Sequence, residues 1–191
     1  MKNYKLVIGL VFILVLSACG QKGIPNAKNW PIEKFSMTNQ DGKDFGLEDL
    51  RGKIWIADFI FTNCTTVCPP MTFNKEKLQT LVKEEGIENV EFVSFSVDPD
   101  VDTPDALKKY GEQFNINFSN HHFLTGYTQD YIENFAKNSF KAIVDKPKTD
   151  DQVVHQTYFY LVDQNGKIMK YYSGNTDVPY AEIIEDIQSI Q

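Results

Sequence analysis

Two cysteines, Cys64 and Cys68, follow directly on the apolar segment Ile54 to Phe61 and precede Pro69-Pro70. Two thiols separated by three residues can exchange a disulfide or bind a soft metal ion. A structural disulfide gains most from closing a long loop, and this pair encloses a very short one. The spacing therefore favours a redox site or a metal site over a structural bridge.

A third possible ligand, His155, lies far along the chain, just before the aromatic segment Tyr158 to Val162. Two thiolates and an imidazole suit Cu(I), and also Cu(II) if an oxygen or a water completes the coordination. Zinc accepts the same donors, but structural zinc sites usually have four protein ligands and the sequence shows no clear fourth. Taken alone, a histidine at the start of a strand is more often a hydrogen-bonded structural residue than a ligand.

The segments around these residues alternate between strand and helix patterns. Ile54 to Phe61 and Val90 to Val97 are almost wholly apolar, as in strands that are buried on both faces of a sheet. Between them, apolar residues recur at helical spacing behind Pro69-Pro70. Thr103 and Thr128 stand where they would cap two further helices. This alternation predicts strands joined by helices.

Two hairpins and a last helix complete the predicted order. Asp41-Gly42 marks the turn of a hairpin from Phe35 to Phe45, and Asn165-Gly166 the turn of a later one. Isoleucines at helical spacing give the C-terminal helix a buried stripe. The order predicts an α/β, thioredoxin-like fold with an N-terminal β-hairpin and a further hairpin insertion.

This fold would bring the candidate ligands together. Ligands bind outside the carboxyl ends of the strands in open α/β sheets, and the loop with Cys64 and Cys68 follows such an end. The N-terminus of the following helix favours thiolate over thiol, which serves nucleophilic attack and metal binding equally. In thioredoxin-like folds the loop before the strand at Tyr158 faces the cysteines, which favours His155 as a ligand.

The N-terminus has the pattern of an export signal. Lys2 and Lys5 precede an apolar stretch from Leu6 to Leu16. This stretch is too short to span a bilayer, which takes about 20 residues. Leu-Ser-Ala-Cys at residues 16–19 resembles a bacterial lipobox, with Cys19 as the lipidated first residue. We therefore expect a signal peptide at 1–18, a lipid-anchored tether at 19–31 and one domain at 32–191, on the extracytoplasmic face of the cell membrane.

The net charge of −7 becomes two units more negative when the signal removes Lys2 and Lys5. Such acidity disfavours nucleic acid as a partner and gives no attraction to anionic lipid. Once Cys19 is lipidated, Cys64 and Cys68 are the remaining thiols, in a compartment where disulfides persist.

Several ordered motifs resemble those of the Sco/SenC family of copper-binding assembly proteins. The similarity runs from about Phe35 to the C-terminus and rests on Asp58-Phe59-Ile60-Phe61-Thr62-Asn63-Cys64-Thr65-Thr66-Val67-Cys68-Pro69-Pro70-Met71, Phe95-Ser96-Val97-Asp98-Pro99 with Asp102-Thr103-Pro104, Phe123-Leu124-Thr125-Gly126 and His155-Gln156-Thr157. The resemblance implies that Cys64, Cys68 and His155 are copper ligands and that the two cysteines form a reversible disulfide. It also implies a copper metallochaperone for the binuclear copper centre of cytochrome c oxidase, with the subunit carrying that centre as partner.

Two other activities fit the same cysteines. A membrane-anchored thiol–disulfide reductase would keep the cysteines of that copper centre reduced, and replacement of His155 would affect it little. A peroxidase, the less favoured alternative, would need one peroxide-reactive cysteine and no stoichiometric copper. An enzymatic role is expected only in these alternatives.

Three further residues have two interpretations each. Asp98 matches an acidic residue of the family suspected of a supporting role near the metal, or it is a turn residue before Pro99. His121 stands where the family often has an aromatic residue. His121 and His122 could be weak metal ligands, although a solvated pair in a loop is favoured.

Overall fold

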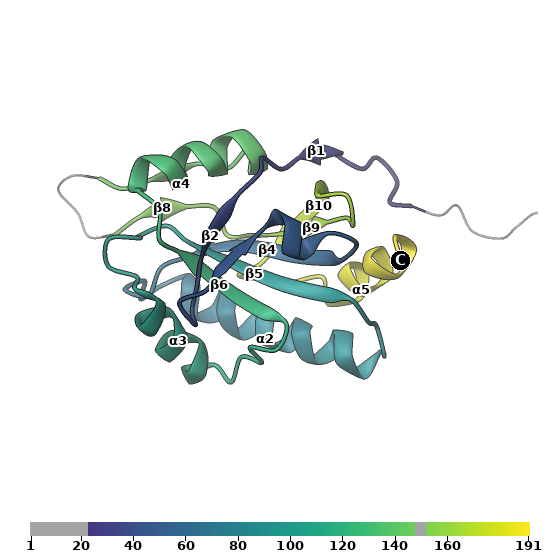
Figure 1. The fold of residues 1–191 in the computed structure, drawn as a ribbon. Helices are drawn as coiled ribbons and strands as arrows, with labels where there is room; N and C mark the ends of the chain where they lie inside the picture. Colours follow the sequence, from purple (N-terminus) through teal and green to yellow (C-terminus); the bar gives the residue numbers. More distant parts are fainter. Residues whose placement is uncertain (1–22, 148–151) are drawn as a thin grey trace, which may run out of the picture.

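The structure is a computed structural model that describes residues 23–147 and 152–191. One eight-stranded sheet runs through the molecule in the order β1-β10-β9-β4-β5-β6-β2-β3 (Figure 1). A small two-stranded sheet, β7-β8, stands apart from it. The strands are β1 (Trp30–Pro31), β2 (Ser36–Asn39), β3 (Asp44–Gly46), β4 (Ile54–Ile60), β5 (Val90–Ser96), β6 (His121–Thr125), β7 (Val144–Asp145), β8 (Val154–His155), β9 (Tyr158–Val162) and β10 (Lys167–Ser173).

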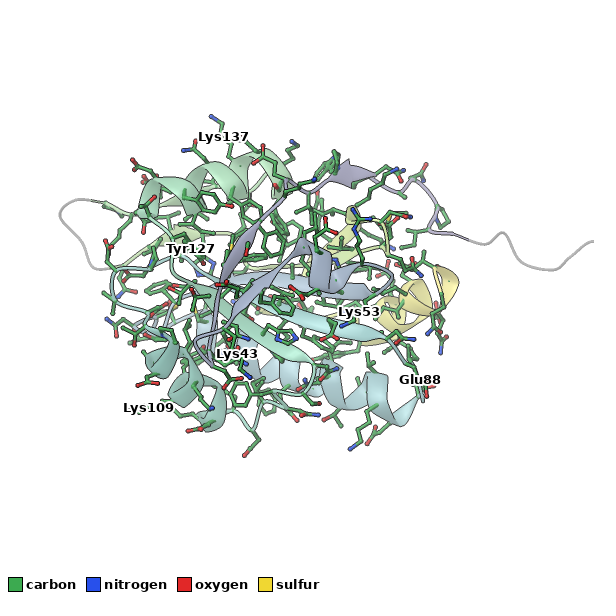
Figure 2. All side chains as sticks on the ribbon, in the orientation of Figure 1. Lys43, Lys53, Glu88, Lys109, Tyr127 and Lys137 are labelled. Atoms are coloured by element: carbon green, nitrogen blue, oxygen red, sulfur yellow. The ribbon has the colours of Figure 1, made fainter. Side chains whose placement is uncertain are left out.

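The helices lie on both faces of this sheet (Figure 1). Helix α2 runs beneath the central strands with α5 beside it, and α4 covers the opposite face. The helices are η1 (Leu47–Leu50), α2 (Cys68–Glu84), α3 (Pro104–Gln113), α4 (Gln129–Phe135) with its π-helical extension η2 (Ala136–Phe140), and α5 (Tyr180–Ser189). Figure 2 shows side chains filling both layers, while Lys109 and Lys137 project outward from the helices.

Alternation along β4 divides the core into two layers. Trp55, Ala57 and Phe59 belong to the layer that contains α4, whereas Ile54 and Ile56 pack with α2 and α5. Every residue of β4 is buried, because its side chains point alternately to two covered faces. Strands β4, β5 and β6 are mutually parallel, so their carboxyl ends meet at one edge of the sheet.

The predicted α/β, thioredoxin-like fold is confirmed. The strands predicted from 54 and 90 are β4 and β5, and the two hairpins are β2–β3 and β9–β10. Thr103 and Thr128 cap α3 and α4 as expected, since their hydroxyls accept from the backbone N–H groups of Ala106 and Tyr131. Ile183 and Ile187 form the buried stripe of α5.

The chain packs against the domain earlier than the boundary expected at 32. Ile24 is buried, the N–H of Lys28 donates to Met169 O at 2.9 Å, and β1 pairs with β10. Residues 24–31 are therefore part of the packed domain, although they had been expected to belong to the tether. Cys19 and the predicted signal peptide lie outside the described residues.

Two histidines lie in a different place from the one expected. The sequence favoured a solvated loop for His121 and His122, and this prediction is wrong because both residues lie on β6. The side chain of His121 is fully buried against Phe92 and Phe123.

Within the described ranges, no helix combines the length and the apolarity needed to cross a membrane.

Candidate metal centre

Cys64, Cys68 and His155 come together beyond the carboxyl ends of the parallel strands. One ligand atom from each of the three side chains lies within 4.8 Å of the other two. Both cysteines are buried free thiols, and His155 is partly exposed. Residues far apart in the sequence therefore form one compact set of soft donors.

Two elements position the cysteines. Strand β4 ends at Ile60, and the following loop carries Cys64, whose N–H donates to Phe61 O at 3.2 Å. Cys68 is the first residue of α2, and Pro69 and Pro70 follow it within the first turn. Proline favours this position because its fixed φ suits the helix and its missing N–H costs no hydrogen bond there.

His155 is brought to the cysteines by the small sheet. β8 pairs with β7, so that His155 stands opposite Val144, and the edge of its ring meets the Phe61 ring at 5.8 Å. Its Nδ1 lies 3.1 Å from Gln156 O, which can accept only if Nδ1 carries the proton. The lone pair of Nε2 then faces Cys68 Sγ at 3.4 Å. This tautomer leaves Nε2 available to a metal ion.

The electrostatics of the site favour one thiolate over the other. The hydrogen bond from Cys68 lowers the pKa of Cys64, and the backbone N–H of Cys68 also donates to Cys64 Sγ, at 3.3 Å. The same contact between the thiols, together with burial, raises the pKa of Cys68. The pair therefore holds one negative charge readily, on Cys64, at the N-terminus of α2.

This donor set fits a soft metal ion. Thiolate sulfur prefers ions such as Cu(I), imidazole accepts copper in either oxidation state, and two sulfurs with one nitrogen suit three-coordinate copper. No further Asp, Glu, His or Cys joins the group among the described residues, which leaves zinc without a fourth protein ligand. The same two thiols lie close enough to form a disulfide after a small movement.

Asp98 lies outside this ligand group. It is buried in the loop after β5, and its Oδ1 pairs with Lys146 Nζ at 2.5 Å. Lys146 follows directly on β7, so the ion pair joins the β5 loop to the small sheet that carries His155. The structure thus gives Asp98 a contact through which it can act on His155 indirectly.

His121 belongs to a buried polar network and not to the group of possible metal ligands. Its Nε2 lies 3.0 Å from Ser94 Oγ, and Lys75 Nζ donates to that same hydroxyl at 3.1 Å. Lys75 also pairs with Asp58 at 2.7 Å, and both of these side chains are fully buried. His122 instead contacts Glu91 at 3.0 Å. Neither histidine approaches Cys64 or Cys68 as a member of their group.

The sequence reasoning assigned no role to Asp102 or Thr62. The carboxylate of Asp102 accepts from the backbone N–H of Thr62, two residues before Cys64. The one sequence signal for Asp102 is that it belongs to Asp102-Thr103-Pro104, one of the motifs that resemble those of the Sco/SenC family. Its contact with the cysteine loop spans 40 residues and is visible only in the folded chain.

Comparison with known sequences places these features in one family. The SCO1/SenC family model matches residues 25–191. The SCO1 protein homolog of Bacillus subtilis is 51% identical over 184 residues, which cover 96% of this chain and 94% of that protein.

Solved structures give the same result. A SCO1/SenC family lipoprotein from Bacillus anthracis has a TM-score of 0.85 and 53% identity, covering 88% of this chain and 99% of the other. BsSco has a TM-score of 0.81 and 51% identity, covering 87% of this chain and 96% of the other. It is described as having a disulfide switch and as a member of the Sco family of cytochrome c oxidase assembly proteins.

A structure with bound metal is also similar. Yeast Sco1 with copper bound has a TM-score of 0.68 and 28% identity, covering 84% of this chain and 90% of the other. With the family model matched over nearly all described residues and the ligand group in place, the chain belongs to the SCO1/SenC family.

Proposed function

We propose that this protein is a copper metallochaperone that binds one copper ion through Cys64 Sγ, Cys68 Sγ and Nε2 of His155. It would use this site in the assembly of the binuclear copper centre of cytochrome c oxidase. The observation that carries the proposal is the convergence of two thiols and one imidazole within 4.8 Å. The copper bound to yeast Sco1, and the assembly role attached to BsSco, support it.

The burial of the site suits transfer by ligand exchange. Cys64 is 5% exposed and Cys68 is fully buried, so an incoming thiolate would reach the metal from the side of His155 and Cys64. His155 comes from the two-residue strand β8, which is held by a single neighbouring strand. It is therefore the ligand that can leave with the least disturbance of the core.

Thiol–disulfide exchange is the second candidate function, and the lowered pKa of Cys64 favours it. The Cys64 thiolate would attack a partner disulfide and form a mixed disulfide, releasing one partner thiolate. Cys68 would then attack Cys64 Sγ and release the second partner thiol, leaving the Cys64–Cys68 disulfide. The partner gains two electrons, and this protein loses them. The proton of the Cys68 thiol passes to the second partner sulfur, while the first partner thiolate takes its proton from solvent. The disulfide switch described for BsSco supports this chemistry in a relative.

A lipid anchor on Cys19 would hold the protein at the extracytoplasmic face of the cell membrane. The lipobox pattern and the relative described as a lipoprotein from Bacillus anthracis support this localisation. The N–H of Gly23 donates to Ser189 O at the end of α5, and that of Ile32 to Gly166 O in the β9–β10 turn. The β9–β10 turn lies near the amino end of β4, since Val162 pairs with Trp55, whereas the cysteines follow the carboxyl end of β4. The C-terminus, next to α5, lies on the opposite side of the molecule from β8, which carries His155 (Figure 1).

An anchor on Cys19 would limit how far the domain stands from the membrane. Cys19 and Gly23 are separated by four peptide units, which reach about 14 Å when fully extended. The amino end of β4 would therefore face the membrane, and the metal centre would face away from it. A partner would have to present its copper centre above the membrane surface.

Copper binding and thiol exchange can be separated with one variant. His155→Ala removes a copper ligand and leaves both thiols in place. A copper chaperone should lose tight binding and copper delivery in this variant, whereas a reductase should still reduce a model disulfide at a similar rate. Parallel measurement of copper affinity and of disulfide reduction therefore decides which activity depends on the complete ligand set.

A further inference from the structure

Asp102 links the loop that carries Cys64 to the neighbouring strand. Its carboxylate accepts from the backbone N–H of Thr62 at 3.2 Å and from the Thr62 hydroxyl at 2.5 Å. The other carboxylate oxygen accepts from Ser96 Oγ at 2.6 Å, at the carboxyl end of β5. One side chain thus holds both the loop after β4 and the end of β5.

The chemistry of this contact is unusual for a purely stabilising one. The side chain of Asp102 is fully buried, and none of the ion pairs found in residues 23–147 and 152–191 includes it. Its partners are neutral N–H and O–H groups, and burial raises its pKa. A buried carboxylate without a cation is costly, so the contribution of Asp102 lies in the groups that its hydrogen bonds hold in place.

What they hold is the start of the cysteine loop. Thr62 stands two residues before Cys64 and two residues after Ile60, whose backbone O accepts from Val97 N at 2.8 Å. On its other side the loop ends at Cys68, which is fixed in the first turn of α2. Cys64 therefore lies on a short segment whose two ends are held by Asp102 and by the helix.

We propose that Asp102 is a positioning residue of the metal centre. By fixing the backbone and the hydroxyl of Thr62, it sets the direction of Cys64 Sγ relative to Cys68 Sγ and the His155 imidazole. This inference rests on the proposed copper site. Groups that orient ligands without touching the metal typically contribute about 10–100-fold to metal affinity, which sets the size of the expected effect.

Four substitutions and one control test this role in the full chain, purified in detergent with reduced thiols. Asp102→Ala removes every contact to Thr62, and Asp102→Asn keeps an acceptor for Thr62 and can donate to Ser96 Oγ. Thr62→Val removes only the hydroxyl contact, whereas Thr62→Ser keeps it. Asn39→Ala is the matched control, because Asn39 is a buried residue whose side chain holds a turn, at Asp41 and Lys43, near the sheet edge.

Three readouts are compared: copper affinity, the sulfur-to-copper charge-transfer absorption of the Cu(II) form, and the thiol–disulfide equilibrium of the metal-free protein in a dithiol buffer. Asp102→Ala is expected to weaken copper binding by about tenfold or more, to shift the absorption and to change the disulfide equilibrium. Thr62→Val is expected to change all three in the same direction but less. Asp102→Asn and Thr62→Ser should restore values close to the parent, and Asn39→Ala should lower stability alone.

Two results would overturn the proposal. The first is a folded Asp102→Ala protein whose absorption and disulfide equilibrium equal those of the parent. The second, which applies if Asp102→Ala does not fold, is a Thr62→Val protein that behaves in all readouts like Thr62→Ser. Failure of the parent itself to bind copper would contradict the proposed function. The metal-free disulfide equilibrium would still decide the role of Asp102 in that case.

Discussion

The backbone N–H of Cys68 donates to Cys64 Sγ at 3.3 Å. The first turn of α2 therefore stabilises a negative charge on the thiol that precedes it in the chain, while Cys68 Sγ lies beside Nε2 of His155 at 3.4 Å. Each sulfur thus has its own neighbour, and the two contacts hold the ligand atoms together. A site arranged in this way needs little rearrangement to bind a metal ion.

His121 should make stability fall as the pH is lowered. Burial lowers the pKa of His121 well below its usual value of 6.5, with Lys75 adding to the effect. The unfolded chain therefore takes up a proton below about pH 6.5 that the folded chain does not, so stability is fully present above that pH and is lost below it. At pH 5 the loss from this residue is at most about 2 kcal/mol.

The replacement His121→Gln keeps a polar group near Ser94. It should make the free energy of unfolding depend less on pH below about pH 6.5. Urea unfolding at pH 7.5 and at pH 5 measures the difference. An equal loss in the parent and in His121→Gln would show that other groups account for the acid sensitivity.

Lys75→Met should destabilise the protein strongly. It leaves Asp58 as a buried carboxylate without its cation, and Asp58 Oδ2 already lacks a hydrogen-bond partner within the described structure. Removing one partner of a buried ion pair typically costs about 3–5 kcal/mol. Denaturant unfolding of the metal-free protein gives the value directly.

The double replacement of Lys75 by Met and Asp58 by Leu is the control for that experiment. Replacing both charges with apolar groups removes the unpaired carboxylate, so most of the lost stability should return. If the double variant is less stable than Lys75→Met alone, the loss arises from packing and not from the unpaired charge.

Ile24→Ala should release the first packed segment of the chain. Ile24 is 6% exposed and packs with the cluster that includes Ile183 and Ile187 of α5. Its truncation is expected to cost about 2 kcal/mol and to release the backbone at Lys28, whose side chain is already exposed, for cleavage by trypsin. Early cleavage after Lys28 in the variant but not in the parent, followed by mass spectrometry, would confirm that this segment belongs to the domain. Equal cleavage in both proteins would count against this assignment.

The sequence predicted the centre of the molecule better than its periphery. The long apolar runs that became β4 and β5, and the thiols that follow β4, have strong local signals. His155 could be joined to them because the fold class predicts which loop faces the cysteines. The spacing of the two thiols indicated a site, whereas His155 was joined to it through the fold class and the family resemblance; the structure brings the three side chains together.

The features that escaped prediction depend on contacts between distant residues. Strands β1, β7 and β8 have two residues each, too few to show a periodic pattern. His121 looked solvated because its burial comes from packing against Phe92 and Phe123 and from Ser94 on the neighbouring strand. The link between Asp102 and Thr62 likewise has no local signature.

Copper titration of the parent with reduced thiols, beside Cys64→Ala, Cys68→Ala and His155→Ala, tests the central claim most directly. The account predicts one tightly bound copper per chain in the parent and its loss in all three variants, with Asn39→Ala binding like the parent. Tight binding that persists in His155→Ala, or weak binding in the parent beside rapid disulfide exchange through Cys64 and Cys68, would contradict the three-ligand copper site and leave thiol exchange as the function.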